Sequence, residues 1–256
     1  MIETDTLLAE LETGTARAAW PDGDAPDGWR LDTELRSAIL ARFARQDVVE
    51  SRAGDAFHFR DRAALAPRAD VPDGVRVVPG GTVIRAGAHL ASGVVVMPPA
   101  YVNVGAWIGP DAMVDSHVLV GSCAQIGARV HLAAGAQVGG VLEPPGARPV
   151  IVEDDAFVGA LSGLFDGVLV GRRAVIGAGV ILTGTSRLYD LTADQVLVGT
   201  PESPLAVPPG AVVVPAVRRA PGIFAAEHGV ALASAAIVKV RDEQTDARVA
   251  LEAALR

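Results

Sequence analysis

Branched aliphatic residues recur at every sixth position through the middle of the chain. The series runs through Val78, Ile84, Leu90, Val96, Val102, Ile108, Val114, Val120, Ile126, Leu132 and Val138. It breaks at residues 140–149 and resumes at Val152, Val158, Leu164, Val170, Ile176 and Leu182. A period of six fits neither an α-helix nor the two-residue alternation of a strand. It predicts a parallel β-helix over residues 75–190, in which three six-residue units close each coil and the aliphatics point inward.

The two flanking parts lack this repeat. Residues 1–74 are predicted to form a small helical domain, because residues 31–45 carry apolar side chains at helical spacing after a capping residue, Asp32 or Thr33. Residues 191–256 are predicted to form a C-terminal cap with strands at 211–214 and 235–240 and a closing helix at 245–255. Such caps protect the open strand edges at the ends of a coil.

Composition narrows the functional classes. The chain has 256 residues, half of them hydrophobic but only 4% aromatic, which favours thin repeated layers over one bulky core. A net charge of -8 argues against a nucleic-acid surface, and no apolar run is long enough to span a membrane. The single cysteine, Cys123, excludes an intramolecular disulfide and is interpreted as a small buried residue. With no secretory signal in the acidic N-terminus, we expect a cytoplasmic protein.

One segment carries a more specific signal. Residues 113–127, MVDSHVLVGSCAQIG, resemble the signature of the tetrahydrodipicolinate N-succinyltransferase family. Matching stretches are RVVPG at 76–80, GGVLEP at 139–144, RLYD at 187–190 and AIVKV at 236–240. The resemblance implies a left-handed β-helix, mainly β, with a small N-terminal helical domain and a C-terminal cap. It also implies a homotrimer with active sites between subunits and small-molecule substrates.

The family's reaction transfers a succinyl group from succinyl-CoA to the amino group of ring-opened tetrahydrodipicolinate, in lysine and diaminopimelate synthesis. The resemblance therefore implies an acyl-CoA co-substrate and no tightly bound cofactor. It places the family's substrate-contacting Arg and Asp on Arg76 and Asp115. A carboxylate suits the removal of a proton from the attacking amine, and an Arg suits a substrate carboxylate. An Asp at a coil corner is also commonly a residue that bonds its own backbone.

Further site candidates are chosen by residue type and by their place along the chain. Arg187 is a second candidate for binding the substrate carboxylate, and His117 is a second candidate base. Ala160, Gly177 and Lys239 are candidate contacts for coenzyme A, whose pantetheine arm lies between subunits in the family; Arg218 or Arg219 are alternatives for its phosphates. The break at residues 140–149 is interpreted as an excursion over a neighbouring subunit.

The sequence departs from the family at one informative place. The family has an Arg-Ser-Glu triplet, with a Glu regarded as catalytic, where this chain has Leu161, Ser162 and Gly163. Three hypotheses follow. The chain is an acyltransferase of specialised metabolism with another donor, such as acetyl-CoA, or another amino-acid acceptor; it is an ordinary succinyltransferase in which Asp166 or His117 takes over the missing role; or it is an inactive β-helix scaffold.

A zinc enzyme on the same kind of coil is a separate alternative. The coil contains His89, His117 and His131, but they fall at different phases of the six-residue repeat. Three histidine ligands need a shared edge, so no metal site is expected.

Overall fold

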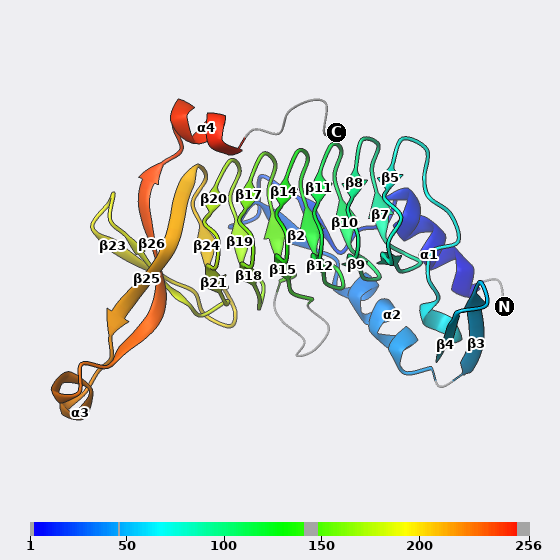
Figure 1. Cartoon of the computed structure of the whole chain (residues 1–256), viewed down its shortest axis with the longest axis horizontal. Helices are drawn as coiled ribbons and strands as arrows, with labels where there is room; N and C mark the ends of the chain where they lie inside the picture. Colours follow the sequence, from blue (N-terminus) through cyan, green and yellow to red (C-terminus); the bar gives the residue numbers. More distant parts are fainter. Residues whose placement is uncertain (1–2, 46, 141–147, 250–256) are drawn as a thin grey trace.

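The computed structural model describes residues 3–45, 47–140 and 148–249, and its centre is a three-sided parallel β-helix (Figure 1). The first sheet contains β5 (Arg76–Val77), β8 (Val95–Val96), β11 (Met113–Val114), β14 (His131–Leu132), β17 (Phe157–Val158) and β20 (Val175–Ile176). The second contains β6 (Val83–Ile84), β9 (Tyr101–Val102), β12 (Leu119–Val120), β15 (Gln137–Val138), β18 (Gly163–Leu164) and β21 (Ile181–Leu182). The third contains β7 (His89–Leu90), β10 (Trp107–Ile108), β13 (Gln125–Ile126), β16 (Ile151–Val152), β19 (Leu169–Val170) and β24 (Ala206–Val207).

The core is the stack of aliphatics that the six-residue repeat predicts. The second residue of nearly every coil strand points inward and is buried, as Ile108, Val120 and Leu132 are. Each pairs in register with its equivalent one coil away, as Ile108 does with Ile126. Full burial of such a side chain contributes about 1.5–3 kcal/mol, so the repeat carries most of the stability of the coil.

The first unit of the repeat is shifted from its prediction. Val77, and not Val78, pairs with Val96 and packs against the core. One extra residue therefore separates β5 from β6, in a turn that contains Gly80 and Gly81, both at positive φ. Two adjacent valines have the same hydrophobicity, so the period alone could not choose between them.

The coil also continues past the expected end of the repeat near Leu191. An antiparallel hairpin, β22 (Arg187–Asp190) with β23 (Gln195–Val198), leaves the coil. The chain then returns, and β24 and the start of β25 (Ala211–Arg219) pair with β19 and β20. Val207 and Val213 restore the spacing of six and are buried. The inserted hairpin broke the register, which hid this last coil.

The N-terminal part is less purely helical than expected. It contains α1 (Glu3–Thr13), α2 (Thr33–Phe43), two antiparallel hairpins and a short 3-10 helix (Ala63–Leu65). The hairpins are β1 (Ala19–Pro21) with β2 (Trp29–Leu31), and β3 (Val48–Ala53) with β4 (Phe57–Arg62). The predicted helix after Asp32 is confirmed, and the Asp32 carboxylate caps it by accepting from the Leu35 amide at 2.8 Å. Hairpins had no six-residue or helical signal to reveal them.

The C-terminal part adds a long arm to the end of the coil. β25 pairs with β26 (Ala231–Val240), and the arm carries α3 (Ile223–Glu227) at its tip, far from the N-terminal helices (Figure 1). The two predicted strands are confirmed but are longer than expected. α4 (Glu243–Val249) confirms the start of the closing helix; residues 250–255 of that prediction, and 141–147 of the predicted excursion, lie outside the described residues. None of the described helices combines the length and hydropathy needed to cross a membrane.

Candidate active site

The turns between the first and second sheets stack into one corner. His117, Gly135, Leu161 and Gly179 occupy equivalent positions there, with φ between 58° and 73°. We call these four residues the active-site corner. Each amide bonds to the turn one coil earlier: His117 to the Pro99 carbonyl, Gly135 to Ser116, Leu161 to Ala134 and Gly179 to Ala160. A left-handed conformation costs a non-glycine residue about 1–2 kcal/mol, which this ladder of bonds offsets.

Asp115 lies directly after β11, where the first sheet meets this corner. One carboxylate oxygen accepts from the Ser116 amide at 2.7 Å, as a corner aspartate does. The other lies 3.9 Å from Nε2 of His131. The Asp115 side chain is half-buried, so its second oxygen is partly open to solvent. The carboxylate is therefore both held by the backbone and available for chemistry.

His131 is the residue that the sequence analysis did not assign to this site. It lies on β14, next to β11, and pairs in register with Met113. Its ring packs edge-to-face on Phe157 with centroids 5.0 Å apart. One coil contains eighteen residues at this point, so a His sixteen positions after Asp115 is the signal that places the two in adjacent coils. A carboxylate beside an imidazole can share and relay a proton.

The structure separates the two arginines expected to bind substrate. Arg76 lies on β5, two strands from β11 in the first sheet, or about 10 Å at the usual strand spacing. Its register places it in the same outward row as Met113 and His131. Arg187 lies on β22, which pairs with β26 and so extends the first sheet beyond β25 and β20. It is six strands from β11, or roughly 30 Å away within this chain. Only Arg76 therefore belongs to the Asp115 region of the same chain.

The triplet that departs from the family lies on the active-site corner and β18. Leu161 is 72% exposed, and Ser162 is buried with Oγ donating to the Gly177 carbonyl at 2.9 Å. Gly163 has no room for a side chain, because a Cβ there would lie 2.5 Å from Cε2 of Phe165 and 2.9 Å from Cδ1 of Ile181. Apolar groups therefore fill the space where a longer side chain would stand.

Two candidates for the missing role lie in different places. His117 is exposed on the active-site corner, two residues after Asp115. Asp166 is exposed in the turn after β18, at the corner between the second and third sheets. The fold thus brings His117, but not Asp166, to the corner that carries Leu161.

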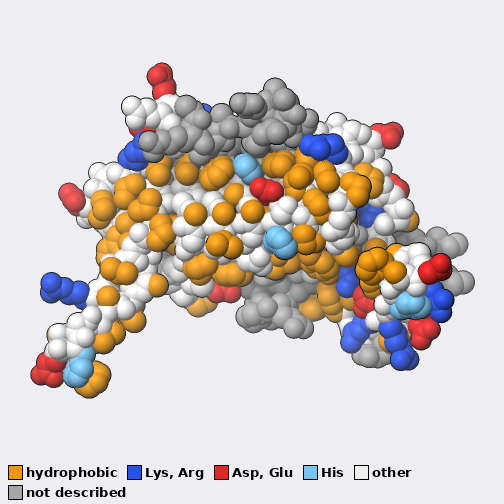
Figure 2. Space-filling view, in the orientation of Figure 1, with side chains coloured by type: hydrophobic (Ala, Val, Ile, Leu, Met, Phe, Trp, Pro, Cys, Tyr) orange, Lys and Arg blue, Asp and Glu red, His pale blue; other side chains and the backbone are white. Residues whose placement is uncertain are grey.

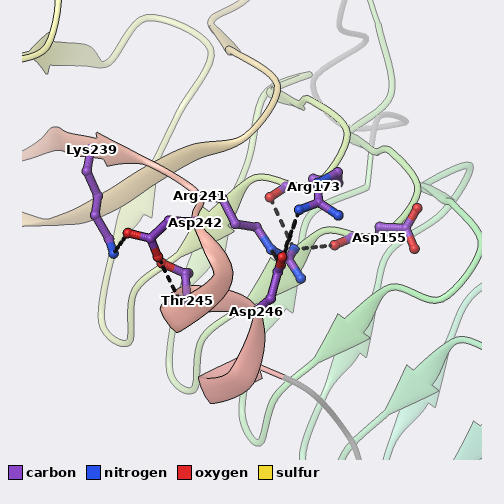
Figure 3. Close-up of polar contacts among 7 residues, drawn as sticks. All are labelled: Asp155, Arg173, Lys239, Arg241, Asp242, Thr245 and Asp246. Atoms are coloured by element: carbon purple, nitrogen blue, oxygen red, sulfur yellow. Dashed lines mark hydrogen bonds and ion pairs between the residues drawn. The ribbon is translucent and has the colours of Figure 1, made fainter.

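The candidate coenzyme A contacts divide in the same way. Ala160 and Gly177 lie beside Leu161 and Gly179, and the Ala160 carbonyl accepts from the Gly179 amide. Lys239 lies instead on β26 and binds Asp242 at 2.8 Å (Figure 3). Lys239 is thus part of the C-terminal cap, apart from the corner.

A polar cluster attaches α4 to the coil (Figure 3). Asp246 binds Arg241 and Arg173, and Arg241 also donates to the Asp155 carbonyl at 2.7 Å. The hydrogen bond from Arg241 lowers the pKa of Asp246. The hydrogen bond from Lys239 likewise lowers the pKa of Asp242, which caps α4 by accepting from the Thr245 amide.

The three coil histidines do not meet. His89 stacks on Trp107 in the third sheet and its Nδ1 lies 2.9 Å from the Glu12 carbonyl oxygen; His117 is on a corner and His131 on the first sheet. Across residues 3–45, 47–140 and 148–249, no group of three potential ligands is placed to hold a metal ion. Cys123 is fully buried against the N-terminal helices, and burial raises its pKa to about 12. The predicted packing role of Cys123 is confirmed.

Comparisons with known proteins identify the family. Residues 149–184 match the model described as the hexapeptide repeat of succinyl-transferase. The 2,3,4,5-tetrahydropyridine-2,6-dicarboxylate N-succinyltransferase of Xylella fastidiosa (strain Temecula1) is 38% identical, over 98% of this chain and 86% of its own length. The protein of the same name from Psychrobacter cryohalolentis is 42% identical, over 98% and 88%. Protein TabB of Pseudomonas amygdali pv. tabaci is 41% identical over 46% of this chain and 39% of its own. The chain is thus an acyltransferase with a left-handed β-helix, and it belongs to the tetrahydropyridine-dicarboxylate N-succinyltransferase family.

Proposed function

We propose that this acyltransferase transfers a small uncharged acyl group, such as acetyl, from its CoA thioester to the amino group of tetrahydrodipicolinate or a related amino acid. One observation carries the proposal. Asp115 lies beside His131 and Arg76 lies in the same outward row of the first sheet, while the position of Gly163 is uncharged and filled by Phe165.

The role proposed for the residues that bind the amine acceptor follows from the chemistry of an amine. The amine must be neutral to attack the thioester, so Asp115 accepts its proton, with His131 at 3.9 Å to share the charge. As the N–C bond forms and the C–S bond breaks, the CoA thiolate leaves and takes up a proton in turn. Arg76 binds a carboxylate of the acceptor, for which its planar fork is suited.

The preference proposed for an uncharged acyl donor follows from the apolar surface on β18. Leu161, Phe165 and Ile181 supply hydrocarbon around Gly163. The terminal carboxylate of a succinyl group would lose water there without gaining a cation, which is costly. An acetyl methyl group has no such charge and packs on the same surface.

We further propose a cytoplasmic homotrimer, with coenzyme A lying along the active-site corner past Ala160 and Gly177. Exposed Val83, Leu161 and Ile181 on this side of the coil support burial against another subunit. On the face shown in Figure 2, hydrophobic side chains cover much of the coil. Exposed apolar patches are typical of protein–protein interfaces.

The alternative is the standard N-succinyl transfer to tetrahydrodipicolinate, which the names of the full-length relatives favour. Thiol release from acetyl-CoA and from succinyl-CoA, each with tetrahydrodipicolinate and with other amino-acid amines, separates the two. We expect kcat/KM to be at least about tenfold higher with acetyl-CoA. Turnover restricted to succinyl-CoA would establish the alternative, and turnover with neither donor on any acceptor would favour an inactive scaffold.

A further inference from the structure

A cavity of about 320 Å³ lies between the β1–β2 hairpin and the corner that joins the third and first sheets. Within this chain it is on a different corner from Asp115 and the active-site corner. Its walls combine aromatic rings with charges of both signs: Arg17, Trp29, Trp107, Glu153, Asp154 and Arg172.

Arg17 is a buried cation at this cavity. The residue is 7% exposed, and its Nε donates to the Gln125 side chain at 2.5 Å. Its guanidinium carbon lies 3.7 Å from the ring centroid of Trp107 and 5.2 Å from that of Trp29. Burial lowers the pKa of Arg17 to about 10, so it remains charged at neutral pH.

The terminal nitrogens of Arg17 are still available. In the part of the chain that the structure describes, they make no ion pair within 4.0 Å and no further hydrogen bond, although the charge of Asp154 acts on Arg17 through space. A guanidinium edge beside aromatic rings is a strong partner for a carboxylate, because two parallel charge-assisted bonds form at once.

The opposite wall supplies a negative charge. Both oxygens of Glu153 are engaged, one by Nε1 of Trp29 at 3.0 Å and the other by the Arg172 amide at 2.8 Å. Glu153 therefore holds the Trp29 wall in place. Asp154 accepts from the Ala128 amide with one oxygen, and its other oxygen lies 3.4 Å from the exposed Arg172 side chain. That second oxygen can accept a ligand ammonium.

We infer that this pocket binds a small zwitterion, an α-amino acid with an apolar side chain. Its carboxylate binds Arg17, its ammonium binds Asp154, and its side chain packs against Trp29 and Trp107. The volume suits a ligand of this size, and the ligand joins the N-terminal hairpin to the coil. This inference does not depend on which acyl group the enzyme transfers.

The protein carries its own probe for this site. The ring centroids of its three tryptophans, Trp20, Trp29 and Trp107, all lie within 6 Å of the Arg17 guanidinium carbon. Intrinsic fluorescence therefore reports on the cavity. The full chain is titrated with L-leucine, L-phenylalanine and L-lysine. Two partial analogues of leucine follow: 4-methylpentanoate, which lacks the amine, and 3-methylbutylamine, which lacks the carboxylate.

We expect a saturable fluorescence change and a raised Tm with leucine or phenylalanine, and weaker effects with lysine and both analogues. Arg17→Lys keeps the positive charge but loses the bidentate guanidinium, and should weaken leucine binding about tenfold or more. Asp154→Asn should weaken leucine binding but leave 4-methylpentanoate unchanged. Arg30→Lys, on the same hairpin but exposed, is the matched control and should bind as the wild type does.

Two results would overturn the inference. One is the absence of a saturable change with any amino acid into the millimolar range. The other is equal affinity in the wild type and in Asp154→Asn, which also covers the case in which Arg17→Lys fails to fold.

Discussion

Replacement of Gly163 by alanine tests whether Phe165 occupies the place of a side chain on β18. The new Cβ would lie 2.5 Å from Cε2 of Phe165 and 2.9 Å from Cδ1 of Ile181. Favourable carbon contacts lie at about 3.5–4.0 Å. The Phe165 ring must therefore turn away, and because Phe165 is only half-buried, it has room to do so.

The expected size follows from two opposing effects. Overpacking costs about 1–3 kcal/mol, whereas a glycine in an ordinary backbone conformation gains about 0.4–1 kcal/mol on change to alanine. Gly163→Ala should therefore lower the free energy of unfolding by about 0.5–2 kcal/mol. With Phe165→Ala already present, only the contact with the flexible end of Ile181 remains. The same change should then cost little or nothing, giving a coupling energy of about 0.5–2 kcal/mol between the two sites.

Urea denaturation followed by far-UV circular dichroism measures the free energy of unfolding for this double-mutant cycle, which comprises the wild type, the two single variants and the double variant. Gly23→Ala serves as the control, because nothing lies within 4 Å of a Cβ at that exposed loop position. It should have the same small effect with or without Phe165. An identical loss for Gly163→Ala in both backgrounds would refute the claim that the ring fills this space.

Other parts of the site and the cap make separate predictions. Asp115→Asn should lower kcat/KM about 10²–10⁴-fold, the usual contribution of a general base, with Tm unchanged. Arg76→Lys should raise the KM for the acceptor about tenfold, because lysine cannot bind a carboxylate in a bidentate manner. Because burial raises the pKa of Cys123 to about 12, the native protein should not react with a thiol reagent, and the unfolded protein should give one equivalent. The hydrogen bond from Arg241 lowers the pKa of folded Asp246, so its stabilisation is present above the unfolded pKa and is lost as the pH falls through the folded value. The stability difference between wild type and Asp246→Asn in urea should thus be present at pH 7 and vanish in acid.

The coil was predictable because burial in it is strictly periodic. Each inward position needs a branched aliphatic, and the period of six is unlike that of any other regular structure. The errors fell where the period carried no information. Val77 and Val78 are equally hydrophobic, and the extra residue near Gly80 decided between them. The hairpin from Arg187 to Val198 displaced the last coil by an unpredictable length.

The site was predictable only in part. The motif around Asp115 indicated the carboxylate, but its neighbour His131 emerges only once eighteen residues are known to close a coil. The absence of charge at Gly163 was plain in the sequence. That Phe165 closes over it depends on the path of a turn, which no pattern in the sequence gives. The cluster of Arg17 with Trp107 joins segments far apart in the chain, so it too required the fold.

The most direct test of the central claim is a competition between donors. Equal concentrations of acetyl-CoA and succinyl-CoA are mixed with tetrahydrodipicolinate and the purified protein, and mass spectrometry of the early products gives the ratio of the two kcat/KM values. We predict N-acetyl product in excess by about tenfold or more, because Leu161, Gly163 and Phe165 form an uncharged surface on which the succinyl carboxylate would lose water. A predominance of N-succinyl product would contradict this account.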